Sequence, residues 1–137
     1  MPLDRVLVSD TREWLAKAYE DLDTAILVMR QKTPRIGISA FHTQQAAEKA
    51  LKAFLTWKDQ PFPKTHDLER LGKACGALDP GLAPVALRLA SISDWAIETR
   101  YPGDWKLPTR SQVTKAIQDV RKLLREILRR LPKQAHP

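Results

Sequence analysis

The spacing of apolar residues is the feature that most constrains this chain. Over most of its length they recur every three to four positions. This period places them on one face of an α-helix, whereas a half-buried strand alternates apolar and polar residues. Proline or glycine interrupts the pattern at several points, where helices are expected to end. We therefore predict an all-α protein.

Five helical segments follow from this pattern, four of them long and the third short. We expect them at about residues 9–31, 37–58, 67–77, 80–101 and 109–131. Short connections join long amphipathic helices mostly as antiparallel neighbours. We thus predict an up-and-down antiparallel bundle of four long helices plus one short helix. It would form one domain over residues 1–137, with a core at about 10–131.

Charge is unevenly distributed along the chain. Lys plus Arg number 23 and Asp plus Glu number 16, which gives a net charge of +7. Residues 105–137 hold nine basic and two acidic residues, so this segment accounts for the whole excess. A basic helix on a neutral body favours an acidic partner, either RNA or an acidic protein. A solvated face that keeps the protein soluble would give the same pattern.

Several classes of protein are disfavoured by what the sequence lacks. No apolar run is long enough to span a membrane, and the first residues do not resemble a secretory signal. The single cysteine, Cys75, cannot form an internal disulfide or a cysteine-based zinc site. No glycine-rich phosphate loop or HExxH motif occurs. We expect a cytoplasmic protein without a membrane contact, metal or cofactor.

The second predicted helix carries a polar group that could bind a ligand. His42, Gln45 and Lys49 lie at positions i, i+3 and i+7, so one ligand could contact all three. Imidazole, amide and ammonium groups together suit a nucleotide or an RNA backbone. The alternative is a structural role, in which Glu48 pairs with Lys52 and Lys49 is solvated.

A second candidate group closes the fourth predicted helix. Arg100 is followed by Tyr101 and then by a proline. A guanidinium beside an aromatic ring can bind phosphate while the ring stacks on a base. The alternative is an arginine that binds carbonyls at the helix end, with the tyrosine packed over it.

The segment FHTQQAAEKALKA, residues 41–53, resembles the signature of the second helix of the HEPN domain (higher eukaryotes and prokaryotes nucleotide-binding). Further similarities lie at Ala18, Asp21, Leu22 and Ala25, at residues 65–68 with Leu71, and at residues 100–102. The resemblance spans about residues 12–130. It implies a helical bundle that is usually a homodimer. It also implies a pairing with a minimal nucleotidyltransferase, as in toxin–antitoxin systems.

Many HEPN branches are metal-independent ribonucleases with an Arg-x(4–6)-His motif late in the bundle. No histidine follows Arg100 at that spacing here. Arg35 with His42 and Arg130 with His136 match the spacing elsewhere in the chain. By this resemblance, His42 is a candidate general base, with Arg35 or Arg100 stabilising the phosphorane.

Three functional hypotheses result. We favour a non-catalytic HEPN module that binds a nucleotide, pairs with a nucleotidyltransferase, or does both. Its binding residues would be His42, Gln45, Lys49, Arg100 and Tyr101. The first alternative is a ribonuclease toxin of the same fold, and the second is an RNA-binding module that uses the basic helix of residues 110–130.

Overall fold

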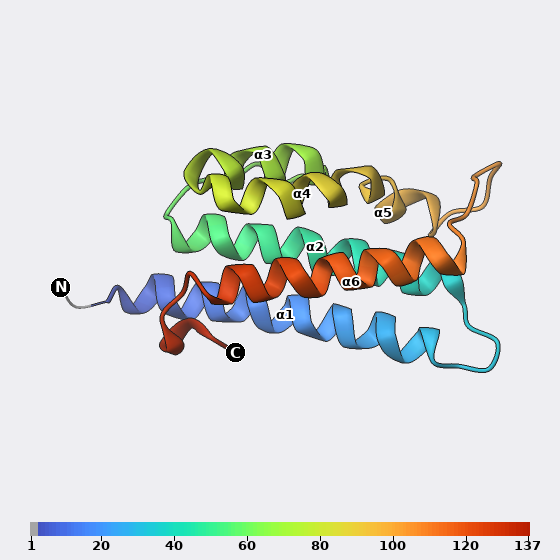
Figure 1. Cartoon of the computed structure of the whole chain (residues 1–137), viewed down its shortest axis with the longest axis horizontal. Coiled ribbons are helices and arrows are strands. Elements are labelled where there is room, and N and C mark those ends of the chain that lie inside the picture. The colour runs from blue at the N-terminus through green and yellow to red at the C-terminus, as the bar shows by residue number, and fades with distance from the viewer. Residues whose placement is uncertain (1–2) are drawn as a thin grey trace.

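Long helices determine the shape of the molecule, as Figure 1 shows. The computed structural model describes residues 3–137, and within this range all regular structure is helical. The α-helices are α1 (Arg5–Met29), α2 (Ile36–Trp57), α3 (Leu68–Leu78), α4 (Ala83–Leu89), α5 (Trp95–Glu98) and α6 (Arg110–Leu128). Short 3₁₀ turns are η1 (Pro80–Leu82), η2 (Ala90–Ile92) and η3 (Lys133–Ala135). The predicted all-α bundle is confirmed.

Helix α1 begins before its predicted start. The Asp4 carboxylate caps it by accepting the backbone N–H groups of Val6 and Leu7 at 2.9 and 3.1 Å. The helix therefore starts four residues before the predicted start at about residue 9. The signal in the sequence was Asp4, which stands just before the apolar residues Val6, Leu7 and Val8.

Helix α2 lies at the centre of the bundle and contacts α1, α3, α5 and α6. Its alanine-rich face is fully buried at Ala46, Ala47 and Ala50. Small side chains allow neighbouring helices to approach closely, and the Ser39 hydroxyl donates to the Ala25 carbonyl of α1 at 2.8 Å. This hydrogen bond fixes the register of α2 against α1.

The short helix α3 runs parallel to α2. The linker of residues 58–67 doubles back along α2, because the Gln44 amide donates to the His66 carbonyl at 3.0 Å. Further along both helices, the Cys75 thiol donates to the Leu51 carbonyl at 3.5 Å. Helix α3 therefore departs from the predicted antiparallel order.

The fourth predicted helix, residues 80–101, is interrupted, so its prediction as one continuous helix is wrong. The 3₁₀ turn η1 replaces its first turn, and a second break, the 3₁₀ turn η2, separates α4 from α5. At the second break, the Ser93 hydroxyl donates to the Ala90 carbonyl at 3.0 Å and accepts the Leu68 N–H at 2.8 Å. Serine side chains compete for backbone groups in this way and weaken a helix interior.

Helix α6 returns along the bundle antiparallel to α1 and α4. Thr109 and Gln112 form a reciprocal capping box at its start, as the sequence allows. Near its other end, the Arg130 guanidinium binds the Asp79 carboxylate at 2.6 Å. This ion pair joins the end of α6 to the turn between α3 and α4.

Candidate functional site

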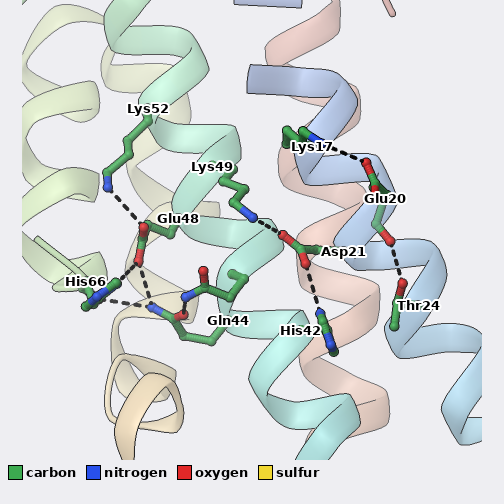
Figure 2. A network of polar contacts seen from close by, with 11 residues as sticks. Lys17, Glu20, Asp21, Thr24, His42, Gln44, Glu48, Lys49, Lys52 and His66 are labelled. Atoms are coloured by element: carbon green, nitrogen blue, oxygen red, sulfur yellow. Dashed lines mark hydrogen bonds and ion pairs between the residues drawn. The ribbon is translucent and has the colours of Figure 1, made fainter. Parts of the chain in front are cut away.

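A single carboxylate on α1 organises part of the predicted polar group on α2. Figure 2 shows the His42 and Lys49 side chains directed at Asp21. His42 Nδ1 lies 2.9 Å from one carboxylate oxygen and Lys49 Nζ lies 2.5 Å from the other. The Asp21 side chain is only 13% exposed. Lys49 is therefore an ion-paired residue, and its expected alternative role as a solvated lysine is wrong.

This contact orients the His42 ring. When Nδ1–H donates to the Asp21 carboxylate, Nε2 faces away from it and is available as a proton acceptor. The same carboxylate fixes the Lys49 ammonium, which stays 24% exposed. The arrangement offers a ligand one positive charge and one imidazole nitrogen in defined positions.

An aromatic ring connects this cluster to the second candidate group. The Arg100 guanidinium lies 4.9 Å from the centre of the Phe41 ring and 5.7 Å from that of Tyr101. The Phe41 ring in turn makes an edge contact with the His42 ring, with centres 5.2 Å apart. Arg100 and Tyr101 are both exposed. A guanidinium held against rings but open to solvent can bind a phosphate.

Two of the candidate residues, Gln45 and Arg35, do not join the cluster around Asp21 and Phe41. The Gln45 amide donates to the Gln44 side chain at 2.7 Å, so it contributes to a different set of contacts. Arg35 is exposed at the N-cap of α2. It precedes His42 by seven residues, which is about 10 Å along a helix. We use the name α2 face for Asp21, His42, Lys49, Arg100 and Tyr101.

A second carboxylate network lies on the other side of α2 (Figure 2). The Glu48 side chain is 5% exposed and lies 2.9 Å from Lys52 Nζ and 2.6 Å from His66 Nδ1. The Lys52 ammonium also lies over the rings of Trp14 and Phe62, at 5.7 and 5.8 Å. The expected Glu48–Lys52 pair is confirmed. The spacing of Glu48 and His66 in the sequence gave no signal of their contact.

The basic residues near the C-terminus divide into two groups. Arg130 is bound by Asp79 and Glu126, and Lys115 lies 3.4 Å from Asp119. In contrast, an exposed group on α6 makes no ion pair with any residue in 3–137: Arg121, Lys122 and Arg125. The positive surface is thus smaller than the sequence count indicates.

Within residues 3–137, no group of three His, Cys, Asp or Glu side chains could hold a metal ion. No helix in the described part of the chain is long and apolar enough to cross a membrane.

The fold and the α2 segment define the class of this protein. The family model of the HEPN domain matches residues 11–131. The chain belongs to the HEPN family. This class of helical domains includes nucleotide-binding and ribonuclease-like members. No curated protein and no solved structure is significantly similar to the chain.

Proposed function

We propose that this HEPN domain binds a nucleotide at the α2 face. The observation that carries the proposal is the single Asp21 carboxylate, which orients the His42 imidazole and the Lys49 ammonium, together with the Phe41 ring, which contacts both His42 and Arg100. Lysine and arginine supply charge-assisted hydrogen bonds to phosphate oxygens. Tyr101, which is 55% exposed, offers a surface on which a base can stack.

Calorimetric titration of the full chain with ATP tests this proposal. We expect Lys49→Met and Arg100→Gln each to weaken binding by about tenfold, because each removes a charge-assisted hydrogen bond. Lys17→Met is the matched control, since Lys17 is an exposed lysine on α1 that pairs with Glu20. Absence of binding by ATP, or an equal loss in the control, would contradict the proposal.

The second part of the proposal is assembly. We propose a homodimer that pairs with a minimal nucleotidyltransferase, in a toxin–antitoxin-like system. Support comes from membership of the HEPN family and from large apolar side chains that the described structure leaves exposed, such as Ile97 at 52% and Trp105 at 43%. Sedimentation velocity should show a dimer that Trp105→Ser weakens. Co-expression with a neighbouring nucleotidyltransferase gene should yield a complex. A monomer that forms no such complex would contradict this part.

One observation favours ribonuclease activity as a second candidate. Although no histidine follows Arg100 at the Arg-x(4–6)-His spacing, Arg100 and His42 both contact the Phe41 ring. His42 Nε2 would accept the proton of a 2′-OH as that oxygen attacks phosphorus. Arg100 would stabilise the phosphorane, and the 5′-oxygen would leave with a proton from solvent.

The products distinguish this activity from binding alone. Incubation with single-stranded RNA should yield 2′,3′-cyclic phosphate and 5′-hydroxyl ends. His42→Gln should abolish cleavage, while His66→Gln should preserve it, because His66 contacts Glu48 on the other side of α2. Full activity of the His42 variant would exclude His42 as the base.

A further inference from the structure

A cavity of about 550 Å³ lies between the interrupted fourth helix and the first turns of α6. Small-molecule sites typically have volumes of about 300–1,000 Å³. None of the residues that line it belongs to the α2 face. Ser91 and Ile92 of the η2 turn and Trp95 of α5 form one wall.

Positive charge surrounds this cavity. Arg88 from α4, Lys106 from the loop before α6, and Lys115 from α6 line it together with one acid, Asp119. Its formal charge is therefore +2. A concave site lined by one sign of charge concentrates ligands of the opposite sign.

The single acid fixes two of these cations. One oxygen of the Asp119 carboxylate lies 3.4 Å from Arg88 Nε, and the other lies 3.4 Å from Lys115 Nζ. Asp119 is 14% exposed, whereas Arg88 and Lys115 are 39% and 68% exposed. The nearest contact of the Arg88 guanidinium with Asp119 is through Nε, and its two terminal amino groups donate no hydrogen bond to residues 3–137, so they are available for an anion.

The remaining lining is apolar and aromatic. Leu89 and Ile92 are buried in the core behind the cavity, and the half-buried Trp95 forms its side. The hydroxyl of Ser111 and the exposed Leu107 complete the rim. Such a site suits a molecule with an anionic end and a flat ring, since the ring gains contact with Trp95 while the anion binds the cations.

We propose that this cavity binds a small organic phosphate that carries a flat ring. The phosphate binds Arg88, Lys106 and Lys115, and the ring packs against Trp95. This site is additional to the α2 face and does not depend on it. AMP is a suitable probe, with ribose 5-phosphate and inorganic phosphate as probes that lack the ring.

Calorimetric titration of the full chain with each probe tests the proposal. We expect AMP to bind and Lys106→Gln to weaken it by about tenfold, because a charge-assisted hydrogen bond is lost. Lys106 makes no ion pair with residues 3–137, so its replacement should leave folding unchanged. Trp95→Leu should weaken AMP by about tenfold through lost stacking. Ribose 5-phosphate and inorganic phosphate should bind more weakly than AMP.

Two variants separate this site from other sources of binding. Lys122→Gln, an exposed lysine on the same helix, should leave AMP affinity unchanged. Lys17→Met, at an exposed lysine on α1, should also leave it unchanged. Loss of AMP binding in Lys49→Met but not in Lys106→Gln would overturn the proposal. So would an equal loss in Lys122→Gln, no AMP binding at millimolar concentration, or equal affinity for AMP and inorganic phosphate.

Discussion

Replacing Glu48 with alanine should destabilise the protein more than any surface substitution. The Lys52 ammonium is 10% exposed and lies 2.9 Å from the Glu48 carboxylate. Removing one partner of a buried ion pair costs about 3–5 kcal/mol, because the remaining charge stays desolvated. The cation–π contacts of Lys52 with Trp14 and Phe62 are present before and after the substitution, so they do not change this difference. His66 is 62% exposed, so its lost contact adds little. We expect a net loss of about 3 kcal/mol of unfolding free energy.

Equilibrium unfolding in urea measures this loss directly. Glu69→Ala is the matched control, because it removes an i,i+4 lysine pair whose side chains are 57% and 75% exposed, and it should cost less than about 1 kcal/mol. The double variant Glu48→Leu with Lys52→Met should recover most of the stability, since no unpaired charge remains. A loss of less than 1 kcal/mol in Glu48→Ala, or no recovery in the double variant, would refute the reasoning.

Three further predictions follow from local geometry. Asp59 has a left-handed backbone with φ of 53° at the end of α2, so Asp59→Gly should raise the unfolding free energy by about 0.5–1 kcal/mol in urea titrations; no gain would contradict this. Burial raises the pKa of the Cys75 thiol to about 12. A thiol reagent at pH 8 should therefore react slowly with the native protein and fast once guanidinium unfolds it. Fast labelling of the native protein would contradict the burial of this thiol. The Arg130 hydrogen bond lowers the pKa of Asp79 below its usual 3.8, so the ionised carboxylate stabilises the fold above that pH. Thermal unfolding of the protein and of Asp79→Asn should therefore differ near neutral pH and converge as the pH falls below 3.8; a constant difference would argue against the pair.

The helices were predictable where one physical signal dominated. Apolar residues at helical spacing located α1, α2, α3 and α6, and the capping threonine Thr109 marked the start of α6. The break in the fourth helix was not predictable, because it depends on Ser93. That side chain binds the N–H of Leu68, which is 25 residues away in the sequence. A tertiary contact of this kind produces no periodic pattern in the sequence.

Residue types on α2 indicated a polar site, but not how it is organised. The spacing of His42 and Lys49 placed both on one face, and in the structure they share a partner. That partner, Asp21, lies on a different helix, and only the register of α1 against α2 reveals it. Gln45 shares the same helical spacing, yet it turns to Gln44. Helical spacing cannot distinguish these two outcomes.

Replacement of Asp21 should distinguish between the two candidate functions of the α2 face, nucleotide binding and RNA cleavage. If the face only binds a nucleotide, the Asp21 carboxylate repels the phosphate while holding Lys49 in place. At a separation of about 6 Å this repulsion is about 0.7–3 kcal/mol for effective dielectric constants of about 80 to 20. Asp21→Asn keeps an oxygen that can accept hydrogen bonds and removes the charge, so ATP should bind about threefold or more tightly.

If His42 is instead a general base, the same substitution should impair cleavage. The Asp21 carboxylate selects the proton on Nδ1 and stabilises the imidazolium that forms when Nε2 accepts a proton. An amide stabilises that cation less, and general base catalysis contributes about 10²–10⁴ in rate. Asp21→Asn should then reduce RNA cleavage by at least about tenfold, even if RNA binds more tightly. Tighter ATP binding with no cleavage by either protein supports a binding module, whereas tighter RNA binding with slower cleavage supports an enzyme. Weaker ATP binding by the variant would show that holding Lys49 in place outweighs the repulsion, contrary to the electrostatic argument.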